Sequence, residues 1–427
     1  MRLWSAQALL PNWFERTRPS DESIEDEVKT IVNKVARNGN AALVELTEKL
    51  DKTKLKPENL RVTNEETKQA YKTVSKKQIS ALKLIKNKVS SHERLVMKRV
   101  TFETSIEGIT VKNVLRPIES VGCYIPGGKA AYPSTLVMTT VPAKTAGVPR
   151  IVVCTPPTSE GKVNPLILVA ADICGVNEVY KVGGAQAIAA LAYGTETIKP
   201  VKKIFGPGNR YVTMAKILVS KDVTIDMPAG PSEVLVLADE TASPRLVALD
   251  MISQAEHGAD SVAGLITTSK KLAEEVASQL GKVADSADRG TIVKEALETY
   301  GFIITCGSTD EMVGLANDFA SEHVEIMMRN PMRVADRITS AGIILSGPCS
   351  PVSLSDYGSG TNHVLPTGGS AQVFSGLSVL DFVRRVSIVE SSREGLLRLK
   401  NSVKALTEAE NLPNHYKAIE ARFENEP

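Results

Sequence analysis

Short apolar runs alternate with amphipathic helical patterns over most of the chain. The runs are too short for buried helices and are bounded by glycine, proline and polar residues, which favours parallel strands buried on both faces. Helices lie between them, so the pattern predicts an α/β fold with parallel sheets covered by helices. The strand candidates are RIVVCTP (150–156), EVYKVGG (178–184), KIFGPGN (203–209), EVLVLAD (233–239), SVAGLITTS (261–269), GFIITCG (301–307), HVEIMM (323–328) and GIILSG (342–347).

Both ends of the chain depart from this alternation. Residues 1–20 have no regular period and form an N-terminal arm, and residues 375–427 are charged and helical, without strands. Alternation in period two around Glu107-Gly108 predicts a hairpin. We therefore expect two α/β domains between the ends, a discontinuous one made of 21–122 with 233–374 and a second one made of 123–232.

A lysine-rich stretch from Lys68 to Arg99 has the period of a long polar helix, which Asn64 would cap, with Glu65 and Glu66 in the first turn. Because no aromatic residues are interleaved with its lysines, we interpret it as a solvated face and not as a nucleic-acid surface.

Composition narrows the class of protein. A chain of 427 residues predicts two or three domains, and 51 basic against 49 acidic residues leave a net charge of +2, which implies no nucleic-acid or membrane partner. The five cysteines are dispersed and never form CxxC, which is typical of reduced thiols in a cytoplasmic protein. The first residues lack a secretory pattern, and no apolar run reaches membrane-spanning length.

Two strand-to-helix junctions carry glycines, VGGAQAIAAL (182–191) and FGPGNRYV (205–212). Glycine at such a junction lets backbone N–H groups approach a phosphate. GxGxxG is absent, however, and no acidic residue follows at the usual ribose-binding distance. A nucleotide site and simple tight turns both remain open, with Gln186 and Asn209 either binding a ligand or capping their helices.

Histidines are scarce, and one lies in SQAEHGADS (253–261). Ser243-Pro244 predicts a helix start, and Gly258 is placed to stop the helix in the left-handed conformation. Gln254 and His257 would then share one face of the last turn. They are either metal ligands or polar surface residues, because this spacing is not a specific metal motif.

The other histidines are His92, in the lysine-rich helix, and three in more informative places. His323 follows Glu322 at a helix-to-strand junction, where we expect the edge of the sheet at which catalysis usually occurs. His363 ends a glycine-rich loop, and His415 lies in the tail. By itself the Glu322-His323 pair could equally be an ion pair or a surface turn.

Taken together, eight stretches resemble the histidinol dehydrogenase family. They occur in the family's order over about 300 residues. The stretches are VGCYIPGG, VGGAQAIAALAYGTE, KIFGPGN, DMPAGPSEVLVLAD, SQAEHGADS, SEHVEIM, DYGSGTNHVLPTGG and the C-terminal histidine, His415. The resemblance implies two incomplete Rossmann-like domains without GxGxxG, and a homodimer with exchanged tails.

The resemblance also implies a zinc- and NAD-dependent enzyme that ends histidine biosynthesis by oxidising L-histidinol twice. Glu322 and His323 would be catalytic: His323 the base for the alcohol and hydrate protons, Glu322 the group that activates water. The implied zinc ligands, which would also contact substrate, are Gln254, His257, Asp356 and His415, the last from the partner chain. Further substrate contacts would be Ser232, His363 and Glu410, and the cofactor contacts Tyr124, Gln186 and Asn209.

Some positions differ from the family's usual residues. Val352 and Ser355 replace an acidic residue and a glycine before Asp356, and Pro413-Asn414 replaces small residues before His415. Cys123 stands where the family usually has an apolar residue, so we interpret it as packing and not as a nucleophile. Competing interpretations are a relative that oxidises another polar alcohol, such as a sulfonated diol, a zinc hydrolase and a non-catalytic binding protein.

Overall fold

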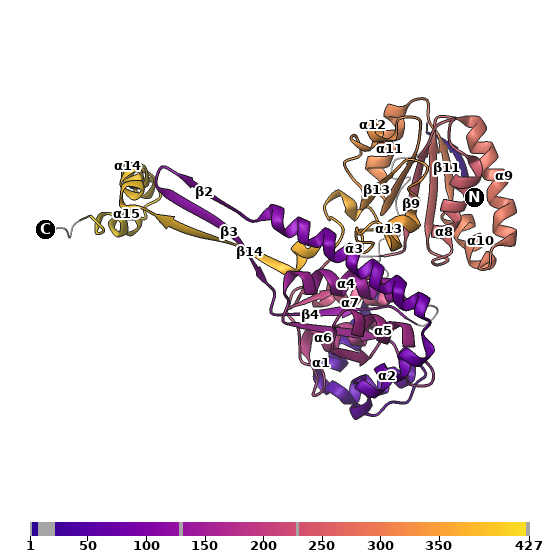
Figure 1. The fold of residues 1–427 in the computed structure, drawn as a ribbon, viewed down its shortest axis with the longest axis horizontal. Coiled ribbons are helices and arrows are strands. Elements are labelled where there is room, and N and C mark those ends of the chain that lie inside the picture. Colours follow the sequence, from indigo (N-terminus) through magenta and orange to yellow (C-terminus); the bar gives the residue numbers. More distant parts are fainter. Residues whose placement is uncertain (1, 7–21, 128–130, 228–229, 424–427) are drawn as a thin grey trace.

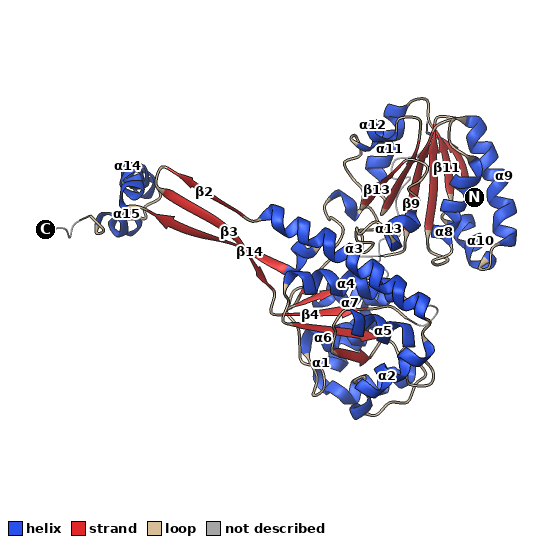
Figure 2. Ribbon diagram, in the orientation of Figure 1, coloured by secondary structure: helices blue, strands red, loops and turns tan. Residues whose placement is uncertain are grey.

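The computed structural model describes residues 2–6, 22–127, 131–227 and 230–423, and these form two lobes and a projecting arm (Figure 1). Each lobe contains a parallel sheet with helices on both faces, which confirms the predicted α/β class (Figure 2). Among the described residues, no helix combines the length and the apolar character that crossing a membrane requires.

The five-stranded lobe is built on β4 (Ser120–Tyr124), β5 (Arg150–Thr155), β6 (Glu178–Lys181), β7 (Lys203–Phe205) and β8 (Thr224–Ile225). These strands are parallel and lie in the order β6-β5-β4-β7-β8. The chain starts at the central strand, adds strands on one side and then on the other. This is the doubly wound topology, in which ligands bind beyond the carboxyl ends of the strands.

Helices cover both faces of this sheet. The apolar side chains of α2 to α5 form one core with the sheet, and those of α1, α6 and α7 form another. The helices are α1 (Glu22–Leu50), α2 (Asn64–Thr73), α3 (Lys76–Val100), α4 (Pro133–Ala146), α5 (Pro165–Ile173), α6 (Gly184–Tyr193) and α7 (Arg210–Val219), with a short 3-10 turn η2 (Pro57–Asn59).

The six-stranded lobe repeats the doubly wound plan. Its parallel strands lie in the order β1-β11-β10-β9-β12-β13. Helices α8 to α10 and α13 pack on one face, and α11 and α12 on the other. The elements are β1 (Arg2–Ser5), β9 (Glu233–Ala238), α8 (Pro244–Ala255), β10 (Val262–Thr267), α9 (Lys270–Ser286), α10 (Gly290–Thr299), β11 (Phe302–Thr305), α11 (Thr309–Phe319), β12 (His323–Met327), α12 (Pro331–Ala335), β13 (Ile343–Ser346), α13 (Val352–Tyr357) and η3 (Ser370–Gln372).

The arm extends away from both lobes and carries the C-terminal helices at its tip (Figure 1). It is an antiparallel sheet in the order β14-β3-β2, where β2 (Phe102–Ile106) and β3 (Ile109–Pro117) form the predicted hairpin. The chain reaches it again through η4 (Val379–Phe382), β14 (Val383–Ser391), α14 (Arg393–Ala409) and α15 (Pro413–Glu420). The α-helices of the tail therefore lie beyond β14, and the expectation of a strandless tail is wrong.

The structure also corrects the domain assignment. Residues 22–100 were expected to join 233–374, but their helices belong to the five-stranded lobe. Val28 and Leu43 of α1 are fully buried in the core shared with α6, and Val89 of α3 in the core shared with α4. Helical periodicity shows that a face is buried but not which sheet buries it. The N-terminal arm differs as well, because β1 is the edge strand of the six-stranded sheet beside β11, whereas residues 7–20 lie outside the described residues.

The long polar helix is in fact two helices. Thr63, not Asn64, caps α2 through a capping box with Glu66, and Ser75 starts α3 through a second capping box with Gln78. Val74 between them is extended, which separates the two helices.

Candidate active site

Glu322 and His323 lie where β12 begins, beside the start of β9, and His323 pairs with Val234 and Ile343 in neighbouring strands. They are therefore at the amino ends of the parallel strands. Ligands of open α/β sheets usually bind at the carboxyl ends, so the expectation that this junction forms the usual catalytic edge is wrong. A helix-to-strand junction always lies at the amino end of the strand that it precedes.

His323 is buried and its ring is held from one side. Its Nδ1 lies 3.0 Å from the backbone oxygen of Glu233 and 3.5 Å from Oε2 of Glu322. In the neutral ring Nδ1–H therefore donates to the carbonyl, and Nε2 carries the lone pair. Nε2 is buried and has no hydrogen-bond partner among the described residues. The geometry thus presents an unpartnered basic nitrogen.

Charges around His323 favour its cation. Burial lowers its pKa, but the adjacent Glu322 carboxylate, Asp356 and the Glu233 carbonyl outweigh burial and raise the pKa to about 9. His363 behaves in the opposite way, since burial lowers its pKa more than Asp356 raises it. Of the two imidazoles, His363 is the one kept neutral.

Asp356 joins these two histidines. Its Oδ1 lies 3.9 Å from Nε2 of His323 and 3.8 Å from Nδ1 of His363. Nδ1 of His363 is also 3.2 Å from the backbone oxygen of Asp356, and its Nε2 is 3.5 Å from Oγ1 of Thr135 in α4. His363 therefore touches both lobes, and the site lies between them.

Gln254 and His257 lie at the end of α8, the helix on which α13 packs with Val352 in the shared core. Gln254 is buried and His257 exposed. The helix ends at Ala255, capped by Glu256 in a right-handed conformation, and Gly258 does not have a positive φ, so the predicted left-handed stop is wrong. The chain instead leaves through a turn in which Ser261 N–H donates to the Gly258 carbonyl.

Of the residues thought to differ near Asp356, Ser355 is fully buried and donates to the Val352 backbone oxygen at 2.7 Å. The buried side chains of Val352 and Ser355 anchor α13 and thereby hold Asp356 in place. Tyr357 next to them is exposed, yet its pKa is raised by partial desolvation and by the charges of Asp356 and Glu256. This places the end of α8 near α13.

The remaining predicted residues are not brought to this point by a single chain. Glu410 and His415 are exposed on the helices at the tip of the arm, far from both lobes in Figure 1. Ser232 is half-buried just before β9. In the described part of the chain, no group of three or more His, Cys, Asp or Glu residues lies close enough to hold a metal ion.

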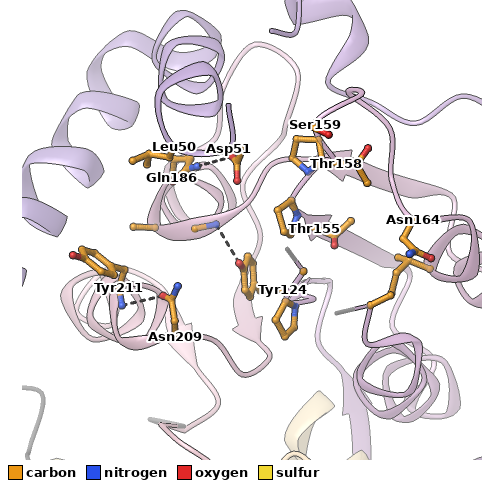
Figure 3. A pocket seen from close by; sticks show the side chains of 18 of the residues that line it. Leu50, Asp51, Tyr124, Thr155, Thr158, Ser159, Asn164, Gln186, Asn209 and Tyr211 are labelled. Carbon is orange, nitrogen blue, oxygen red and sulfur yellow. Dashed lines mark hydrogen bonds between the residues drawn. The ribbon is translucent and has the colours of Figure 1, made fainter. Parts of the chain in front are cut away.

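A cavity of about 880 Å³ opens at the carboxyl ends of the five-stranded sheet (Figure 3). Tyr124 at the end of β4, Gln186 in the first turn of α6 and Asn209 at the start of α7 all line it. Tyr124 is buried at the end of β4, its pKa is raised to about 12 by burial, and its hydroxyl oxygen accepts from Gly184 N–H at 3.1 Å. The N-termini of α6 and α7 carry Gln186 and Asn209 beside this cavity, which suits an anionic ligand.

A buried ion pair between Lys216 and Asp226 supports the glycine turn before α7. Lys216 Nζ donates to the backbone oxygens of Gly206 (3.0 Å) and Met227 (2.9 Å), and Asp226 accepts from Gly206 N–H at 2.8 Å. Gly206 has φ +114°, and a Cβ there would lie 2.1 Å from the Tyr124 carbonyl oxygen. Only glycine fits, so this turn is built for close backbone approach.

Two residues that the sequence did not reveal belong to these sites. Glu233 supplies the carbonyl that orients His323, and its side chain is buried at the start of β9. A carboxylate opening an apolar strand that is buried on both faces was the available signal. Asp51 lines the cavity, but sequence spacing could not identify it because it lies far from Gln186 in the sequence.

The fold and the site define a class of two-lobed α/β proteins, with a cavity at the strand ends of one lobe and a buried Glu-His pair in the other. Comparison with known proteins identifies the member of that class. A histidinol dehydrogenase family model matches residues 14–423. The chain belongs to the histidinol dehydrogenase family and is an oxidoreductase of that kind.

Individual relatives agree over the whole length. The chain is 45% identical over 409 residues to a histidinol dehydrogenase of Methanothermobacter thermautotrophicus, which covers 96% of each. It is 44% identical to one of Archaeoglobus fulgidus, over 96% of this chain and 98% of the relative. The crystal structure of histidinol dehydrogenase from Elizabethkingia anophelis is similar with a TM-score of 0.93, 36% identity, and coverage of 99% and 98%.

Proposed function

We propose that this protein oxidises L-histidinol to L-histidine through L-histidinal, a zinc-dependent four-electron reaction with two NAD⁺ that ends histidine biosynthesis. The observation that carries the proposal is His323, whose Nε2 is buried and finds no hydrogen-bond partner among the described residues, while Nδ1 is fixed by the Glu233 carbonyl. A base for an alcohol needs this arrangement, in which one nitrogen is oriented and the other is free to take a proton.

For zinc we propose Gln254, His257 and Asp356 of one chain with His415 of the partner subunit. The donor types suit the ion, since imidazole nitrogen and carboxylate oxygen are common zinc ligands. Asp356 lies between two imidazoles and next to α8, which carries Gln254 in its last turn, and this supports a polar centre here. Zinc would supply a template that binds the imidazole and amino nitrogens of histidinol.

In the first oxidation, His323 Nε2 takes the hydroxyl proton of histidinol while the carbinol carbon gives its hydride to NAD⁺, which yields histidinal. In the second, Glu322 takes a proton from a water molecule as the water oxygen adds to the aldehyde carbon, and protonated His323 returns its proton to the aldehyde oxygen, which gives the hydrate and leaves His323 neutral again. The resulting hydrate gives up a hydroxyl proton to His323 and a hydride to a second NAD⁺, which yields the carboxylic acid. A positioned base contributes roughly 10²–10⁴-fold to such a step. His363 and Ser232 would contact the substrate in both oxidations.

NAD would occupy the cavity of the five-stranded lobe, with Tyr124, Gln186 and Asn209 as contacts. The cavity is supported as a dinucleotide site by the two helix N-termini beside it and by the glycine turn at Gly206. The doubly wound strand order supports the same position, since ligands of this topology bind at the carboxyl ends.

We further propose a cytoplasmic homodimer in which each arm completes the other chain's site with Glu410 and His415, Glu410 facing the substrate's ammonium group. The arm supports this, because it exposes many large apolar side chains that an isolated protein would rarely leave in water. They include Phe102, Ile106, Val386, Ile388, Val389, Leu397, Leu399, Leu406 and Leu412.

The test is the amount of NADH formed per mole of L-histidinol consumed, measured with zinc, after chelation and after zinc is restored. We expect a ratio near two that chelation abolishes and zinc restores. A ratio near one would contradict the role of Glu322 in the aldehyde step. No NADH from a folded, zinc-loaded dimer would reject histidinol as substrate in favour of another polar alcohol.

A further inference from the structure

The carboxylate of Asp51 lies in the cavity and has no function in the reaction proposed above. Asp51 follows the last residue of α1 and lines the cavity together with Leu50 (Figure 3). Its Oδ2 lies 3.4 Å from Nε2 of Gln186. A Cβ on Gly183 would lie 3.3 Å from its Oδ1, so the carboxylate lies against the turn between β6 and α6.

The surroundings of Asp51 leave its charge without a cation. Among the described residues, no lysine, arginine or histidine lies within ion-pair distance of it, and those that line the cavity include no lysine or arginine. Burial raises the pKa of Asp51 to about 6. The nearby Oε1 of Gln186 is buried and also has no described partner. The half-buried Asp51 carboxylate and this buried amide oxygen together call for hydroxyl or N–H donors from a ligand.

The position of Asp51 in the fold identifies the donors. In doubly wound sheets that bind dinucleotides, a carboxylate near the end of the second strand accepts hydrogen bonds from the ribose. Here the second strand is β5, and it runs into Thr155-Pro156-Pro157 without a carboxylate. The Gly183 turn contacts both Pro156 and Asp51, so a residue of α1 stands at the place that β5 leaves vacant.

The position of Asp51 also indicates which half of the dinucleotide it would bind. Helices α3 and α4 of this lobe contact the loop that follows α13 and carries His363, through Lys88 beside Gly360 and Thr135 beside His363. Helix α1 packs in the core on the opposite face of the sheet. The nicotinamide must approach His323 between the lobes, so Asp51 would face the adenosine half. Ile31 and Leu50 line the cavity with it and offer apolar surface for a base.

We propose that Asp51 accepts hydrogen bonds from the 2′- and 3′-hydroxyls of the adenosine ribose and thereby makes the enzyme select NAD over NADP. This inference rests on the proposed NAD dependence. A 2′-phosphate removes one of the donors and brings a second negative charge against the carboxylate. No described cation of the cavity offsets that charge.

The test compares Asp51→Asn and Asp51→Ala with the unchanged enzyme, using NAD, NADP and an NAD analogue that lacks the adenosine 2′-hydroxyl. Loss of hydrogen bonds to a charged acceptor predicts a fall in kcat/KM for NAD of roughly 10- to 150-fold, mainly through KM. The unchanged enzyme should discriminate against the deoxy analogue by a similar factor and Asp51→Ala by much less. The preference for NAD over NADP should narrow in both variants.

Glu48→Gln is the matched control, because Glu48 is an exposed carboxylate of α1 that pairs with Lys54 at 3.4 Å and does not line the cavity. It should keep the nucleotide preference of the unchanged enzyme. If both Asp51 variants are folded dimers and still discriminate fully against the deoxy analogue, Asp51 does not bind the ribose. Failure of the unchanged enzyme to reduce either nucleotide would instead reject the proposed NAD dependence.

Discussion

Glu233 and Glu322 each hold the other's backbone. Oε2 of Glu322 accepts from Glu233 N–H at 2.8 Å, and Oε2 of Glu233 accepts from Glu322 N–H at 3.2 Å. The other oxygen of Glu233 accepts from Gly368 N–H at 3.0 Å. The buried carboxylate of Glu233 thus fixes the start of β12 and the loop after His363. The backbone carbonyl of the same residue fixes the ring of His323.

Glu233→Gln tests this positioning role. The amide keeps the shape but replaces a charged acceptor with one that can accept at only one atom, so at least one backbone N–H loses its bond. We expect a stability loss of about 1–3 kcal/mol and a fall in kcat, with KM for NAD unchanged, because the cavity lies in the other lobe. Thermal unfolding and steady-state kinetics measure both. Glu240→Gln, an exposed carboxylate 3.3 Å from Arg329, is the control; an equal effect there, or a change confined to KM, would contradict the role.

His323 predicts the pH profile. Its pKa is raised to about 9, so the cation persists above neutrality and the base form appears only as pH rises. The rate kcat/KM for histidinol should therefore increase about tenfold per pH unit below 9 and level off above it. The same shift stabilises the fold below the unfolded pKa, a contribution that is lost as pH rises through about 9. A profile that levels off near pH 6.5 would show that Glu322 and Asp356 do not control this histidine.

Lys216→Met tests the support beneath the glycine turn. The side chains of Lys216 and Asp226 are 1% and 0% exposed, so removing the lysine leaves a buried, uncompensated carboxylate. Such a loss costs about 3–5 kcal/mol, and replacing Asp226 by Leu as well should recover much of it. Urea unfolding measures the loss, with exposed Lys221→Met as the control. A double variant no more stable than Lys216→Met would contradict the ion-pair account.

Cys123→Ala should keep most of the activity, whereas Glu322→Gln should chiefly lose the aldehyde step. Cys123 is fully buried, its Sγ lies 3.9 Å from the Thr139 carbonyl, and burial raises its pKa to about 12, so a thiolate nucleophile is not available. Single-turnover kinetics started from histidinol and from histidinal separate the two oxidations. The reverse result, with Cys123→Ala losing the second step, would assign that step to a thiohemiacetal.

Local patterns predicted much of this molecule. Apolar runs gave the parallel strands, period-two alternation gave the hairpin around Glu107-Gly108, and Asn209 indeed caps α7 through bonds to two backbone N–H groups. Long-range partners were not predictable in this way. The apolar stripe of α1 does not state which sheet will bury it, and nothing near Gln186 in sequence indicates that Asp51 will stand beside it.

The site shows the same limit. Gln254 and His257 were recognisable as a pair on one helix end, but the spacing could not show that one is buried and the other exposed. Glu233 could have been found from the sequence, because a carboxylate at the start of EVLVLA must be buried if the strand is. The ligand role proposed for His415 rests on resemblance alone, since its own chain holds it away from the lobes.

The sheet of the arm imposes an order on biosynthesis. The edge of β3 that β14 will cover is synthesised long before β14, and Val383 pairs with Pro117 while Ser391 pairs with Ile109. Until β14 is available, β3 carries an open edge next to the exposed Phe102 and Ile106 of β2. Open apolar edges recruit other strands. A nascent or truncated chain that ends before β14 is thus a candidate for chaperone capture or aggregation, even when both lobes have folded.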